Sequence, residues 1–151
     1  MAYEELLMEA QLLGIDTYEK PMTSKIKGLY SNNIIWINKN SSITEKFCTL
    51  SEEIAHHLKT VGDILDQSVI SNRKQELLAR TWAYEKLIPL SKIVQAQLDG
   101  VRNRFELAEY LGVTEEFLQC ALDRYRDKYG IYTFVEGKKI FLDPLTGIKE
   151  G

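Results

Sequence analysis

The stretch S-I-T-E-K-F-C-T-L-S-E-E-I-A-H-H-L-K, residues 42–59, decides the fold. Ser42 and Glu45 stand three positions apart, which is the spacing of a capping box, so they predict a helix that begins here. Its apolar residues recur every three or four positions and form one stripe: Ile43, Phe47, Leu50, Ile54 and Leu58. A helix with a single apolar stripe buries it against other elements. The stretch therefore predicts an amphipathic helix that runs to about Lys59.

Upstream of this helix, the sequence predicts another helix and a β-hairpin. Residues 2–13 place apolar side chains on one helical face, and Gly14 is a natural stop. Residues 26–30 and 34–38 are β-rich and flank a Ser-Asn-Asn turn at residues 31–33, which is typical of a hairpin.

Downstream, the pattern is mainly helical and ends in a second hairpin. A helix is expected from Ser71 to about Leu87, because Pro89 cannot continue it. Shorter segments follow: a helix to Leu98, a helix-turn-helix-like pair at 104–111 and 114–129, and a hairpin from 131–135 and 140–142. The order of elements predicts an α+β fold, with a first region over residues 1–90 and a helical region over residues 91–151.

Composition limits the class of protein. The chain has 151 residues and a net charge of −3, which argues against binding to nucleic acid or an anionic membrane through bulk charge. The acidic N-terminal residues contain no secretory signal, and no apolar run is long enough to span a membrane, so we expect a cytoplasmic protein. Cys48 and Cys120 form no CxxC motif; reduced thiols are the simpler expectation, with a disulfide as the alternative.

The helix-turn-helix-like segment does not have the charge of a DNA-binding module. Residues 101–130 contain five basic and six acidic side chains, and Glu115 and Glu116 begin the second helix. Because phosphate neutralisation supplies most of the affinity for DNA, we expect a packing or protein-recognition role and no direct DNA binding.

The central helix also contains a metal-site pattern, E-E-x-x-H. Glu52 and His56 are four residues apart on one helical face, opposite the apolar stripe, and Glu53 occupies the position that a general base takes in H-E-x-x-H proteases. The alternative is an acidic face that only meets water. His57 lies about 100° round the helix from His56, so it should not share a metal with it and is expected to be partly exposed or in a supporting role.

The next helix supplies a candidate third ligand. Glu76, Ala79 and Ala83 share one face, and the small alanines allow a close approach to the E-E-x-x-H helix. That approach would bring the Glu76 carboxylate over Glu52 and His56. The alternative is a weak helical ion pair between Glu76 and Arg80.

Together, these segments resemble the ImmA/IrrE family of zinc-dependent metalloendopeptidases, in particular the short forms of phages and mobile elements. Residues 53–57, E-I-A-H-H, resemble the family's H-E-L-G-H segment, and residues 76–89, E-L-L-A-R-T-W-A-Y-E-K-L-I-P, resemble its E-x-x-A-x-x-F-A-x-x-L-L-M-P helix. The predicted hairpin at 28–38 and the segment at 103–117 are also similar, so the resemblance covers most of the chain.

The resemblance implies a zincin-like protease core over residues 1–90. It implies Zn²⁺ as cofactor, with His56 and Glu76 as ligands and Glu53 as general base. Glu52 stands where the family has its first histidine ligand, and we expect it to serve as the remaining ligand. Two carboxylates on the ion would acidify its water less and weaken the preference for zinc over other divalent cations.

The implied activity is a cytoplasmic metal-dependent endopeptidase that cleaves a helix-turn-helix repressor of a phage or mobile element, that is, an anti-repressor. The alternative is a catalytically degenerate relative that binds such a repressor without cleaving it. A DNA-binding regulator is disfavoured by the local charge, and neither DNA nor a membrane is expected as a partner.

Overall fold

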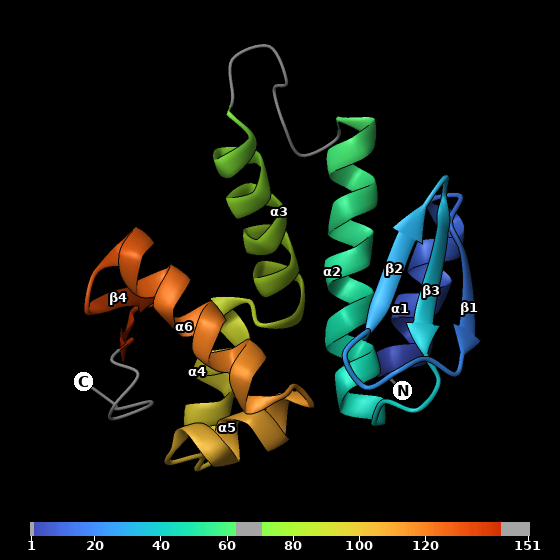
Figure 1. Cartoon of the computed structure of the whole chain (residues 1–151). Coiled ribbons are helices and arrows are strands. Elements are labelled where there is room, and N and C mark those ends of the chain that lie inside the picture. Colours follow the sequence, from blue (N-terminus) through green and yellow to red (C-terminus); the bar gives the residue numbers. More distant parts are fainter. Residues whose placement is uncertain (1, 63–70, 143–151) are drawn as a thin grey trace. The chain divides into compact units, whose positions relative to one another are not determined.

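A computed structural model of the chain describes residues 2–62 and 71–142 (Figure 1). It confirms the α+β class, with both helices and small sheets. The chain forms two compact units, residues 1–83 and 84–151, and the division falls inside helix α3 (Asn72–Leu87). Asp63 and Asp66, which follow the central helix, lie outside the described residues.

The first unit contains a three-stranded sheet and two helices that pack on it. Its elements before α3 are α1 (Ala2–Leu12), β1 (Asp16–Lys20), β2 (Gly28–Ser31), β3 (Ile34–Asn38) and α2 (Ile43–Val61). Strands β2 and β3 pair antiparallel and confirm the predicted hairpin. Asn32 and Asn33 both have positive φ, which the tight turn of such a hairpin requires.

Strand β1 was not predicted. It pairs parallel to β3, with Tyr18 opposite Trp36, so the sheet order is β1-β3-β2. Its sequence, D-T-Y-E-K, has one large apolar residue, and four of its five residues are exposed. An exposed edge strand of this kind has no hydrophobic alternation, so it leaves no signal in the sequence.

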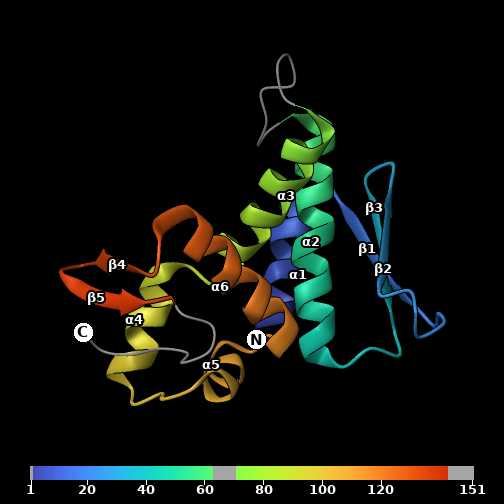
Figure 2. The same ribbon diagram turned by 60° about the vertical axis from the view of Figure 1, so that its left-hand side comes forward.

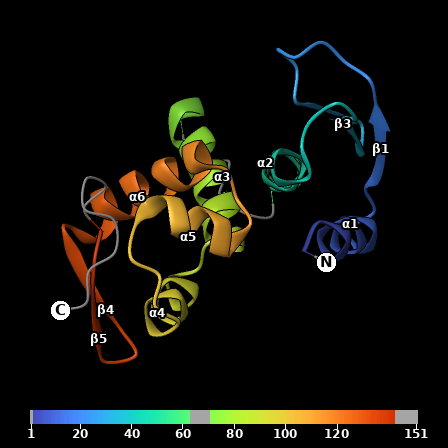
Figure 3. The same ribbon diagram turned by 90° about the horizontal axis from the view of Figure 1, so that it is seen from below.

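Helix α2 begins as predicted. The Ser42 side chain accepts a hydrogen bond from the Glu45 amide, and the Glu45 carboxylate accepts one from the Ser42 amide. Helix α2 packs against β2, β3 and α1, with Leu50 and Ile54 almost fully buried, whereas Ile43 at its first turn is exposed. Helices α1 and α2 lie on the same side of the sheet (Figure 3). The opposite face of α2 is thereby left for polar side chains.

The second unit is helical and ends in a two-stranded hairpin (Figure 2). Its helices are α4 (Leu90–Leu98), α5 (Arg104–Leu111) and α6 (Glu115–Tyr129), and its strands are β4 (Tyr132–Val135) and β5 (Lys138–Phe141). Thr114 caps α6, as its position before the acidic turn suggests. The buried Tyr125 hydroxyl donates to the Ile88 carbonyl at 2.7 Å and joins α6 to the start of this unit.

The expectations about membrane spans and about the cysteines can also be compared with the structure. Among its described residues, no helix is long and apolar enough to cross a bilayer. Cys48 is buried and Cys120 is exposed, and these two described cysteines form no disulfide.

The long connection between β1 and β2 is held by one buried side chain, Asn38, at the end of β3. Its amide nitrogen donates to the carbonyls of Met22, Thr23 and Ile26, and its oxygen accepts from the amides of Met22 and Asn40. Asn38 is 2% exposed, and both polar atoms of its side-chain amide are used in these hydrogen bonds. The loop that leads into β2 therefore depends on this amide.

We expect Asn38→Ala to lower the free energy of unfolding by about 2–4 kcal/mol, because it removes all the hydrogen bonds that the buried Asn38 amide makes to the backbone of this loop. Asn40→Ala, at an exposed neighbouring position, should change it by less than about 0.5 kcal/mol. Urea unfolding of both variants measures the difference. Equal stability of the two variants would contradict the role given to Asn38.

Candidate metal and catalytic site

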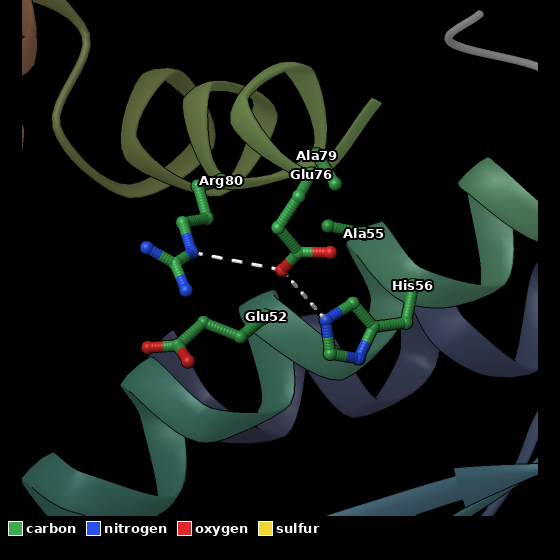
Figure 4. Close-up of a pocket in the computed structure, with 6 residues that line it drawn as sticks. All are labelled: Glu52, Ala55, His56, Glu76, Ala79 and Arg80. Carbon is green, nitrogen blue, oxygen red and sulfur yellow. Dashed lines mark ion pairs between the residues drawn. The ribbon is translucent and has the colours of Figure 1, made fainter. Parts of the chain in front are cut away.

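A small pocket of about 120 Å³ lies between α2 and α3 (Figure 4). Its lining combines acidic, basic and small residues: Glu52, Ala55 and His56 from α2, and Glu76, Ala79 and Arg80 from α3. Ala55 and Ala79 are both 1% exposed, so the two helices meet where neither has a side chain beyond Cβ. This close approach brings the polar groups of the two helices within reach of each other.

The His56 ring lies between two carboxylates. Its Nδ1 is 3.3 Å from Glu53 Oε1 on the same helix, and its Nε2 is 3.6 Å from Glu76 Oε1 on α3. The pKa of His56 is raised, mainly by the Glu53 carboxylate and to a smaller extent by Glu76. Burial of the ring acts in the opposite direction and lowers this pKa. The Nε2 atom thus faces the pocket while Nδ1 faces back along its own helix.

The Glu76 carboxylate is shared among three partners. Lys59 Nζ lies 2.8 Å from its Oε2, whereas Arg80 Nε and His56 Nε2 each lie 3.6 Å from its Oε1. The hydrogen bond from Lys59 is the main reason that the pKa of Glu76 is lowered, so the carboxylate stays ionised at neutral pH. The expected pairing of Glu76 with Arg80 therefore exists, but Lys59 is its closer partner.

Glu53 is unusual because it is a carboxylate that is only 8% exposed. Its side chain packs beneath the first residue of β2: a Cβ added at Gly28 would lie 3.4 Å from Glu53 Cγ and 2.6 Å from Thr49 Cγ2. Strand β2 can approach α2 this closely because Gly28 has no side chain. The position of the Glu53 carboxylate is thus set by the sheet as well as by its helix.

His57 is buried, at 6% exposure, which excludes partial exposure, one of the two alternatives that the sequence left open. Its Nδ1 is 2.8 Å from the Tyr30 hydroxyl of β2, and the two rings meet edge to face. This pair joins α2 to β2 on the side of the helix away from Glu76, which supports the expectation that His57 shares no ligand sphere with His56.

The structure brings together His56 and Glu76, with Glu53 in contact with His56. Glu52 lines the same pocket, but it is an exposed residue. In residues 2–62 and 71–142, no three His, Cys, Asp or Glu side chains are gathered as closely as a metal ion needs. Lys59 was not singled out from the sequence, because its contact with Glu76 depends on the packing of α3 beside α2.

Comparison with known families identifies the family of the chain. Residues 10–123 match the IrrE N-terminal-like domain of the peptidase M78 family. The match covers most of the chain, and the chain therefore belongs to this family, as the resemblance of its motifs predicted. A search of curated proteins finds no match.

A peptidase of this family is expected to use a metal ion, and the donor atoms present suit one. Imidazole nitrogen and carboxylate oxygen are ordinary zinc ligands, and two ligands of one tetrahedral zinc lie roughly 3.3 Å apart. The 3.6 Å between His56 Nε2 and Glu76 Oε1 is close to this spacing. The chemistry and spacing of this pair thus fit a divalent ion, and Glu52 is the other carboxylate that lines the pocket.

We expect Gly28→Ala to reduce the free energy of unfolding by about 1–3 kcal/mol, because its methyl group would overlap Thr49 Cγ2. Thr49→Ser removes that methyl group and should recover part of the loss in the double variant. A double-mutant cycle by urea unfolding measures the coupling, and additive effects of the two substitutions would contradict this packing.

Proposed function

We propose that this protein is a metal-dependent endopeptidase in which Glu52, His56 and Glu76 hold a divalent cation, with Zn²⁺ first among the candidates. The observation that carries the proposal is the meeting of His56 Nε2 and Glu76 Oε1 across α2 and α3 at 3.6 Å. The proposed protease core is zincin-like and spans residues 1–90, and residues 91–151 form the helical region that follows it.

In this proposal Glu53 is the general base. A bound divalent ion supplies Lewis acidity to a peptide carbonyl and to the attacking water. Glu53 takes a proton from that water and returns it to the amine nitrogen that leaves. Its burial and its contact with the His56 ring, at 3.3 Å, hold the carboxylate beside the proposed site.

Glu52 changes the properties of the proposed site. A carboxylate in place of an imidazole adds a negative charge, which makes the attacking water less acidic and the turnover slower. It also makes the donor set richer in oxygen, so the preference for zinc over other divalent ions such as Mn²⁺ becomes weaker.

The proposed substrate is a helix-turn-helix repressor that keeps a phage or mobile element silent, and the proposed location is the cytoplasm. This part of the proposal rests on the resemblance to the short phage forms of the family. Cleavage would inactivate the repressor, so the protein would act as an anti-repressor.

A second candidate is a relative that binds the repressor without cleaving it. Two observations favour it: Glu52 is exposed, and among the described residues no three metal-binding side chains are gathered. In this case the pocket would be a remnant of the protease site, and the protein would act through its binding surface alone.

Four substitutions separate the two candidates. For a working site, Glu52→Ala and His56→Ala should both lose the metal and abolish cleavage. Glu53→Gln keeps the three ligands, so it should retain the metal while turnover falls by roughly 10²–10⁴-fold. Glu52→His supplies a neutral imidazole and should raise both zinc preference and the rate of cleavage.

Metal analysis and a cleavage assay on a candidate repressor give the readouts. If Glu52→Ala and Glu53→Gln leave repressor binding unchanged, and only the Glu52→His variant cleaves, the non-cleaving candidate is correct. If the Glu53→Gln variant loses the metal, the proposal that Glu53 acts only as the general base is contradicted.

The helical region after Val101 should not bind duplex DNA tightly. Its acidic residues outnumber its basic ones by one, and Glu115 and Glu116 occupy the first turn of α6, where a recognition helix would contact phosphates. Titration of a fluorescent duplex should therefore show no submicromolar binding at physiological salt. Tight binding with a steep salt dependence would refute this expectation.

A further inference from the structure

The ion pair between Lys59 and Glu76 has no role in the function proposed above. Lys59 Nζ lies 2.8 Å from Glu76 Oε2, and the two side chains are 28% and 38% exposed. Arg80, the other cation at this carboxylate, is 64% exposed and lies 3.6 Å away. Lys59 is therefore the closer and more enclosed of the two cations that contact Glu76.

The two oxygens of Glu76 face different partners. Oε2 accepts the hydrogen bond from Lys59, while Oε1 faces His56 Nε2. Lys59 stands three residues after His56 on α2, so a single face of one helix presents a metal-binding nitrogen and a cation to the same carboxylate. A hydrogen bond that holds one oxygen of a carboxylate also fixes the direction of its other oxygen.

We propose that Lys59 is a positioning residue, which holds Oε2 of Glu76 so that Oε1 alone is presented beside His56 Nε2 as a metal ligand. This inference rests on the proposed function, because it assumes that His56 and Glu76 hold the ion. Glu53 has the matching position on the other ligand, since its carboxylate contacts His56 Nδ1 at 3.3 Å. Each of the two paired ligands thus contacts a further side chain of α2.

Orientation of a ligand by an outer partner has a measurable effect on metal affinity. Removal of such a partner typically weakens metal binding by 10–100-fold. The positive charge of Lys59 acts in the opposite direction, because it repels a cation. We expect orientation to prevail, since Lys59 contacts Oε2 and leaves Oε1 beside His56 Nε2.

The test is the affinity for Zn²⁺ of the full chain, measured by competition with a chromophoric chelator. We expect Lys59→Met to weaken binding by roughly 10–100-fold, while Lys59→Arg, which keeps the cation, stays within a few-fold of wild type. The matched control is Lys27→Met, which removes a lysine from another ion pair, 2.6 Å from Glu45 at the start of α2. This control should bind zinc like wild type.

The visible spectrum of the Co²⁺-loaded protein provides a second readout that a merely structural role would not change. Without Lys59, both oxygens of Glu76 are available to the ion, so its coordination number should rise and the Co²⁺ absorption should weaken. Circular dichroism and the urea midpoint confirm that the variants fold, and methionine preserves the helical propensity of this position.

The outcomes distinguish this inference from the proposed function. If wild type binds Zn²⁺ and Lys59→Met binds equally or more tightly, the role of Lys59 is overturned and the metal site stands. If wild type and Lys27→Met bind neither Zn²⁺ nor Co²⁺, the metal site itself is overturned, and the inference falls with it.

Discussion

The site depends on the close approach of α2 and α3. Ala55 and Ala79 are almost completely buried at the pocket between these helices, and their small side chains let His56 Nε2 come within 3.6 Å of Glu76 Oε1. A larger residue at either alanine would separate the two polar groups, because packed interiors do not absorb added volume easily. The contact between His56 and Glu76 depends on these small side chains. So does the position of Glu76 beside Lys59.

Much of the fold could be predicted because its signals are local. The capping box at Ser42 and Glu45 marks the start of α2, and the Ser-Asn-Asn turn marks the β2–β3 hairpin. The approach of Glu76 to His56 could also be predicted, since the spacing of Glu76 and Ala79 places both on one face of α3. These features depend on neighbours in the sequence or on helical periodicity, which a single sequence contains.

The remainder could not be predicted because it depends on contacts between distant segments. Strand β1 is defined by its parallel pairing with β3, and its own five residues are mostly polar. His57 is buried where its ring meets the Tyr30 hydroxyl of β2, whereas helical spacing left open whether it is partly exposed. The hold of Lys59 on Glu76 likewise appears only when α3 lies beside α2. Each of these features needs the tertiary structure before it can be recognised.

We propose that this member of the peptidase M78 family holds its metal with one imidazole and with carboxylate oxygens. X-ray absorption spectroscopy at the zinc edge of the Zn²⁺-loaded wild-type chain reports this ligand set. We expect scattering from nitrogen and oxygen neighbours at roughly 2.0–2.2 Å, with the multiple-scattering signature of a single imidazole. A spectrum with two imidazoles, or with sulfur at about 2.3 Å, would contradict it.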